Sequence, residues 1–215
     1  MPLPGSPAVR LLDSERLAFL RHLRPASVKR LASLRMEDVV GLEGKRARTR
    51  VKVLRTRYPS AGPRELGQHV IESTKGLAAL SGSVSGVFGL VSIPADLVVM
   101  AWLETRMLAD IATAYGVDLR FRRARTELLD VLGEANGVGP LKRSGPKMLG
   151  KVATVIAEKG GFSTLGRAMP LVAAPVTAWL NNHHVQMVGE AALRQYDGFV
   201  RAAAKRAAAS GASAP

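Results

Sequence analysis

The histidines are the first residues of this chain that could do chemistry, as metal ligands. His183 and His184 are adjacent, and adjacent side chains on a helix point about 100° apart, so the two cannot easily bind one ion. His22 and His69 have no ligand spacing to that pair, and the chain has no cysteine. We therefore predict no metal site, no iron–sulfur or thiol chemistry and no cofactor.

A second candidate is the run Ser-Gly-Ser-Val-Ser-Gly at residues 81–86, which superficially resembles the turn around a catalytic serine. It lies in an apolar context without a nearby base to accept the serine proton. The chain also lacks the GxSxG, Walker, HExxH and GxGxxG patterns. We name no catalytic residue, and a hydrolase of unrecognised type stays an alternative.

Asp96 is a lone carboxylate beside an apolar segment and follows Pro94 by two residues. In the first turn of a helix, such a carboxylate is stabilised by the free backbone N–H groups and the helix dipole. The alternative is a polar contact inside a pocket, because a buried carboxylate needs a charged or hydrogen-bonding partner. In that case Asn182 or His183 would be its buried polar partner.

Two uncharged stretches, residues 76–95 and 168–189, must position these groups. The first is long enough to cross a hydrocarbon core of about 30 Å. However, it contains four glycines and four serines, and Gly82 and Gly86 form a GxxxG stripe. Such a stripe lets two helices approach closely, either in a membrane or in a soluble bundle. Both interpretations remain open from the sequence.

The two stretches also resemble each other. Tyr115 follows Pro94 by 21 residues, and Tyr196 follows Pro175 by the same interval. This echo suggests two related helical hairpins, with a chance match as the alternative. Between the hairpins we predict a lipid-holding pocket, lined by Leu97, Val98, Trp102, Leu171, Val172 and Trp179.

Helical periodicity extends over most of the chain, so the predicted fold class is all-α, a compact helical bundle built around the two apolar Gly/Pro-rich hairpins. The segment at about 37–58 is ambiguous, because its cations also alternate as in a strand, but its length and neighbours favour helix. Gly116 is placed to end a helix. The helices are expected over about 13–23, 25–36, 37–58, 63–79, 94–115, 119–133, 147–159 and 176–208.

The formal net charge of +14 predicts an anionic partner, either a membrane surface or nucleic acid. Residues 1–60 contain 14 basic and 5 acidic side chains, and residues 120–167 contain 10 and 4. The intervening 61–119 are apolar, with 3 basic and 6 acidic side chains, which favours lipid. A merely solvated helix face is the third interpretation. The expected contacts to an anionic surface are Lys45, Arg46, Arg48, Arg50, Arg122 and Arg123.

The N-terminus is rich in proline and has no apolar segment typical of a signal peptide. We expect a cytoplasmic protein that associates peripherally with the inner face of the cytoplasmic membrane. The predicted organisation is a basic helical extension over 1–50, a helical domain over 51–205 and a disordered tail over 206–215.

Several of these segments resemble the EcsC family over about residues 50–200. The similarity rests on Tyr58-Pro59-Ser60, Pro94-Ala95-Asp96, Tyr115-Gly116-Val117-Asp118 and the segment 174–196 with Asn181-Asn182. The doubled histidine and Ala173-Ala174-Pro175 depart from the family's pattern. The resemblance implies an all-helical, largely bacterial protein, and that family has no agreed biochemical activity.

The hypothesis from the sequence is thus an EcsC-like, non-catalytic helical protein that binds lipid or an anionic membrane surface. The first alternative is a basic helical protein that binds nucleic acid, although only 5% of residues are aromatic and no recognised binding motif occurs. The second alternative is a soluble module for protein–protein interaction.

Overall fold

The computed structural model describes residues 36–88, 93–136 and 170–211. Within these ranges all the regular structure is helical, which confirms the predicted all-α bundle. None of the described helices is both long and apolar enough to cross a bilayer. The helices are α3 (Met36–Arg57), α4 (Pro63–Phe88), α5 (Ile93–Ala114), α6 (Arg122–Ala135) and α9 (Pro170–Gly211).

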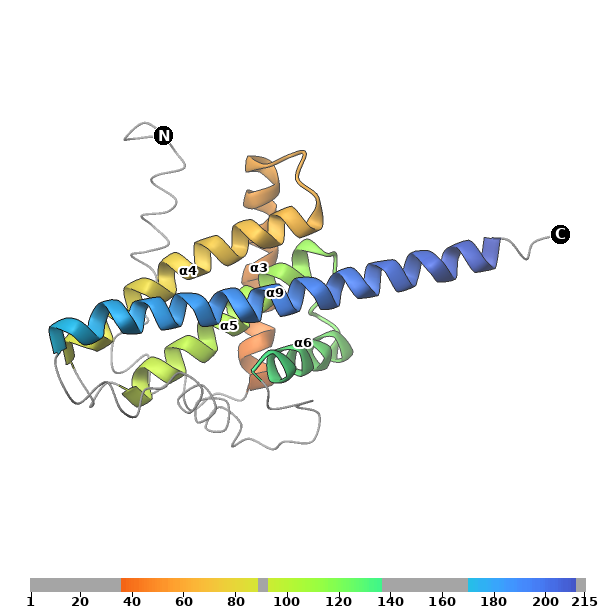
Figure 1. Cartoon of the computed structure of the whole chain (residues 1–215). Helices are drawn as coiled ribbons and strands as arrows, with labels where there is room; N and C mark the ends of the chain where they lie inside the picture. Colours follow the sequence, from red (N-terminus) through yellow and green to blue (C-terminus); the bar gives the residue numbers. More distant parts are fainter. Residues whose placement is uncertain (1–35, 89–92, 137–169, 212–215) are drawn as a thin grey trace.

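The long helix α9 runs across the bundle and packs most extensively against α4 (Figure 1). Helix α3 crosses the direction of α4 and α9, and α6 lies near its N-terminal end. The C-terminal end of α9 projects beyond the other helices, and residues 201–210 are all exposed. Within the described ranges, the body is therefore formed by α3, α4, α5, α6 and the first part of α9.

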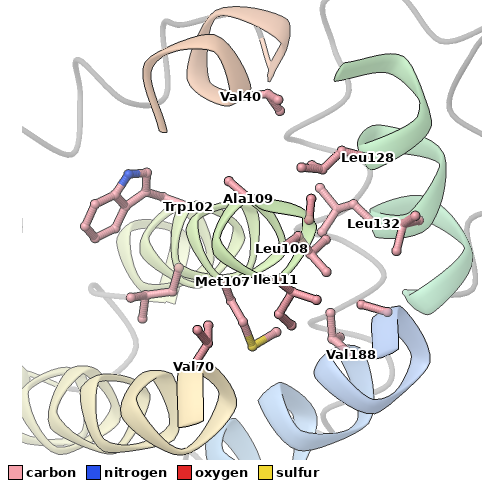
Figure 2. Close-up of a cluster of buried hydrophobic side chains, with 14 of the residues drawn as sticks. Val40, Val70, Trp102, Met107, Leu108, Ala109, Ile111, Leu128, Leu132 and Val188 are labelled. Carbon is pink, nitrogen blue, oxygen red and sulfur yellow. The ribbon is translucent and has the colours of Figure 1, made fainter. Parts of the chain in front are cut away.

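Helix α5 lies at the centre of this body (Figure 2). Its residues 99–112 are buried, except for the half-buried Arg106. Around it lie Val40 of α3, Val70 of α4 and Val188 of α9, with the leucines of α6 on a further side. A helix that is apolar on all sides must be buried, and this one is buried by protein.

Two glycines allow α4 and α9 to pack closely in antiparallel directions. A Cβ atom at Gly67 would lie 2.5 Å from Leu193, and one at Gly189 would lie 2.5 Å from Ile71. Neither position has room for a side chain unless the opposite helix moves. These contacts fix which residues of α9 face α5.

The predicted C-cap at Gly116 is confirmed, because its φ of 81° lies in the left-handed region that glycine adopts without strain. The Val117 amide donates to the Ala112 carbonyl at 2.9 Å, and the Gly116 amide donates to the Thr113 carbonyl at 3.0 Å. This Schellman pattern ends α5 and directs the chain towards α6.

Some boundaries differ from those expected. Helix α4 continues to Phe88, so the GxxxG segment is part of it, and α9 begins at Pro170 rather than at Val176. Pro175 lies close to the start of α9, where its missing N–H removes one hydrogen bond without ending the helix. The expected domain boundary at residue 50 falls inside α3, and the expected tail boundary at 206 falls inside α9. The helices expected over 13–23, 25–36 and 147–159 lie outside the described residues, except for Met36.

Candidate anionic-surface site

The exposed side of α3 combines cations with apolar side chains. Lys45, Arg48 and Lys52 are exposed, and within the described ranges none of them forms an ion pair. Leu42 and Val53 are also exposed, by 47% and 45%. At 100° per residue these side chains fall on one side of the helix. The opposite side carries the buried residues Met36, Val39, Val40, Glu43, Gly44, Ala47 and Val51.

The part of the second basic block that the structure describes, at the start of α6, lies next to α3. A Cβ atom at Gly44 would lie 2.7 Å from Leu119, and one at Gly41 would lie 3.2 Å from Arg125 Nη1. The start of α6 therefore packs on α3, and Phe121 beside it is 66% exposed. We call this surface the α3–α6 basic face, made of Lys45, Arg46, Arg48, Lys52, Arg122 and Arg123, with Leu42, Val53 and Phe121 exposed among them.

Two of the expected surface cations are exposed but already paired. Arg46 bonds to Glu43 at 2.8 Å and is 55% exposed, and Arg123 bonds to Glu127 at 3.0 Å and is 91% exposed. Their charges are partly neutralised, so the unpaired cations contribute most of the positive potential of the face.

Arg50 does not lie on this face, contrary to expectation. Its side chain is only 18% exposed, because its position on α3 turns it towards the buried side and α5. Its Nε atom donates to both carboxylate oxygens of Asp110, at 3.0 and 2.8 Å, and its Nη2 donates to Glu43 Oε2 at 3.0 Å. Trp102 Nε1 donates to Glu43 Oε1 at 3.2 Å. Arg50 is thus part of a buried polar cluster between α3 and α5.

Burial and pairing act in opposite directions on the titration of this cluster. Burial raises the pKa of Asp110 to about 6, and the nearby Arg50 guanidinium only partly offsets that effect. For Arg50, burial alone would lower the pKa, but the carboxylates of Asp110 and Glu43 outweigh it and the pKa is raised. The cluster therefore holds a permanent cation and a carboxyl group that can take up a proton in mildly acidic solution.

The raised pKa of Asp110 predicts a pH dependence of stability. The folded protein binds this proton more tightly than the unfolded chain, whose value is 3.8, so the stabilisation is fully present below about pH 4 and is lost as the pH rises through about 6. A shift of this size corresponds to about 3 kcal/mol. Urea unfolding of wild type and Asp110→Asn between pH 4 and 7 measures it, as the difference between their free energies of unfolding. That difference should fall with rising pH, and a flat or rising difference would contradict the assignment.

A second buried cluster joins α5, α6 and α9. Glu104 has no exposed surface, and its Oε2 accepts a hydrogen bond from Asn136 Nδ2 at 2.9 Å. His184 Nε2 lies 2.9 Å from Glu104 Oε1 and 3.1 Å from Asn136 Oδ1. The central helix thus carries two buried carboxylates, Glu104 and Asp110, each with its own partners from other helices.

The tyrosines of the sequence echo meet in the structure. The rings of Tyr115 and Tyr196 stack with centroids 5.6 Å apart. The Tyr115 hydroxyl donates to Asp197 Oδ1 at 2.6 Å, and Arg64 of α4 forms an ion pair with the same carboxylate. Burial raises the pKa of the Tyr115 hydroxyl, and its hydrogen bond to Asp197 adds to the effect. This group ties α4, α5 and α9 together.

The residues predicted to line a lipid pocket have different surroundings. Trp102 is buried against α3, and Val98 is partly buried, whereas Trp179 is 63% exposed and stacks on His183 at 5.7 Å. The pocket itself stays a prediction, because the side chains of Leu97, Leu171 and Val172 lie outside those described.

The predicted buried polar group is only partly described. His183 is exposed rather than buried, because the α4–α9 contacts turn the next residue, His184, towards α5. Asn182 is half-buried, and its Oδ1 has no hydrogen-bond partner among the described residues. The side chain of Asp96 is outside those described.

The sequence analysis did not find Glu43, Glu104 and Asn136. Each of them is a polar residue on the otherwise apolar, buried side of its helix. They can be recognised only once the buried side of each helix is known. No group of three His, Asp or Glu side chains suited to a metal occurs in the described ranges.

Part of the chain is similar to a known protein family. The model of the EcsC protein family matches residues 44–145. Over these residues the chain is similar to the EcsC family. The matched residues include most of α3 and all of α4, α5 and α6. They therefore include most of the α3–α6 basic face. No curated protein and no solved structure matches the chain.

Proposed function

We propose that this protein binds anionic lipid surfaces peripherally through the α3–α6 basic face. The observation that carries the proposal is the combination of Lys45, Arg48 and Lys52, exposed and without ion-pair partners among the described residues, with the exposed side chains of Leu42 and Val53. Electrostatic attraction and shallow apolar insertion together are what hold a helix on an anionic bilayer.

The energy available to this face is sufficient for reversible binding. Each Lys or Arg near an anionic membrane surface contributes about 1 kcal/mol. The exposed side chains of Leu42, Val53 and Phe121 add a contribution from apolar area removed from water. Binding of this kind weakens with salt, because the charges are exposed and screened.

The apolar side chains favour lipid over nucleic acid as the partner. A phosphate backbone attracts the same cations, but it has no apolar layer that Leu42, Val53 and Phe121 could enter. Nucleic acid is therefore kept as an outcome of the experiment. Catalysis is not proposed.

The test is a charge reversal on the basic face. The triple variant carries Lys45→Glu, Arg48→Glu and Lys52→Glu. It is expected to bind vesicles of phosphatidylcholine and phosphatidylglycerol at least about tenfold more weakly than wild type, because three attractive charges become repulsive. Flotation of the full chain with vesicles at low salt measures this. The control carries the same change of charge at Arg201, Lys205 and Arg206, on the exposed end of α9.

The control is expected to bind vesicles nearly as well as wild type. Equal weakening by both triple variants would show that only net charge matters and would overturn the assignment to the α3–α6 basic face. Absence of binding to anionic vesicles at low salt, or tighter salt-sensitive binding to duplex DNA, would overturn the lipid proposal. The double variant Leu42→Ser with Phe121→Ser should weaken binding to vesicles and leave any binding to duplex DNA unchanged.

A further inference from the structure

A groove lies beside the basic face, between α3 and the C-terminal end of α5. It is a shallow groove, open to solvent, with a volume of about 420 Å³. Three of its six lining side chains are cations and none is acidic. The lining residues are Arg48, Val51, Lys52, Arg55, Thr56 and Thr113.

The three cations line the same side of the groove. Arg48, Lys52 and Arg55 are separated by four and three residues, which places them on one side of α3. Like charges at this spacing repel one another and destabilise a helix. The nearby acid Asp118 bonds to Arg120, with contacts of 2.6–3.0 Å, and its remaining electrostatic interaction with Arg48 is the weakest of those that lower its pKa. An anion bound between the cations would remove the repulsion.

Arg55 is held in position by a contact to the backbone. Its Nη2 atom donates to the carbonyl of Ala114 at 2.9 Å, at the end of α5 where carbonyls lack helical partners. The remaining N–H groups of the guanidinium stay available to a ligand. The hydroxyl groups of Thr56 and Thr113 donate to carbonyls of their own helices, so the cations are the donors available to the anion.

We infer that this groove binds a phosphate monoester. A monoester carries a charge of about −1.5 to −2 at pH 7 and presents three acceptor oxygens, which suits a groove lined by three cations and no acid. A phosphodiester carries a single charge and fewer free oxygens. The phosphate can belong to a lipid headgroup or to a soluble molecule. The lipid form of the inference rests on the proposed function, and the soluble form does not.

The experiment compares two ligand pairs with two matched variants of the full chain. Vesicles contain phosphatidate, a monoester, or phosphatidylglycerol, a diester, at equal anionic fraction, and glycerol phosphate is the soluble probe in calorimetric titration. The groove variant is Arg48→Gln with Lys52→Gln. The control variant, Lys45→Gln with Arg122→Gln, removes the same charge from exposed positions of the basic face outside the groove.

Wild type is expected to prefer phosphatidate by about tenfold, as for one additional charge-assisted contact. The groove variant should lose that preference, and the control variant should keep it while binding both vesicles more weakly. Equal binding of wild type to both vesicles, without binding of glycerol phosphate, would overturn the groove and leave the proposed function standing. In another outcome, wild type binds glycerol phosphate, the groove variant does not, and neither protein binds either vesicle. That outcome would support the groove and overturn the proposed lipid surface.

Discussion

Arg50→Ala is expected to lower the free energy of unfolding by about 3–5 kcal/mol, because it leaves buried carboxylates without their shared partner. The side chains of Glu43 and Asp110 are only 2% and 8% exposed. Glu43 keeps its contacts with Arg46 and Trp102, so the loss falls mainly on Asp110, whose carboxylate must take up a proton or stay buried without its closest cation. Urea unfolding followed by circular dichroism at pH 7 measures the loss.

The control is Arg48→Ala, two residues away on the same helix. Its side chain is exposed and forms no ion pair within the described ranges, so the change should stay within about 0.5 kcal/mol. Adding Asp110→Asn to Arg50→Ala should recover a substantial part of the stability, since the unpaired charge is then removed. Equal, small effects of Arg50→Ala and Arg48→Ala would return Arg50 to the surface role that the sequence suggested.

His184→Ala is expected to lower the free energy of unfolding by about 2–3 kcal/mol, because it removes the ring nitrogen that lies beside the buried Glu104 carboxylate and contacts Asn136 Oδ1. Glu104 has no exposed surface, and its Oε1 lies 2.9 Å from His184 Nε2. Asn136 would remain as the donor to the other carboxylate oxygen. Thermal or urea unfolding of the two proteins at one pH measures the difference.

The doubled histidine supplies the control for this prediction. His183→Ala removes the same side chain from an exposed position, where only the stacking with the exposed Trp179 is lost, and should change stability by less than about 0.5 kcal/mol. If His183→Ala proved the more costly change, α9 would have to be rotated by about 100° from the arrangement described here.

Local features were predictable from the sequence because their causes are local. Helical periodicity placed α3, α5 and α6 to within a few residues, and a glycine after the last periodic position predicted the end of α5 at Gly116. The division of charge into two basic blocks also followed from the sequence alone. The resemblance to the EcsC family is confirmed over residues 44–145.

The placement of polar side chains required the tertiary structure. Arg50 belongs to the same run of cations as Arg48 and Lys52, yet its partner Asp110 is 60 residues away on α5. Periodicity identifies a side of a helix, but a residue at the edge of that side becomes buried or exposed according to what the neighbouring helix presents there. Only the crossing of α3 and α5 decides that Arg50 is inside and Arg48 outside.

The sequence by itself determined that the chain is helical, strongly basic and built around an uncharged apolar centre, since composition and short-range spacing control these properties. The tertiary structure decided that the start of α6 packs on α3, that His184 rather than His183 turns inward, and that the central helix carries two paired carboxylates. The physical reason is the range of the forces involved. Helix formation depends on neighbours a few residues away, whereas a buried ion pair or a shared surface depends on how helices distant in sequence pack together.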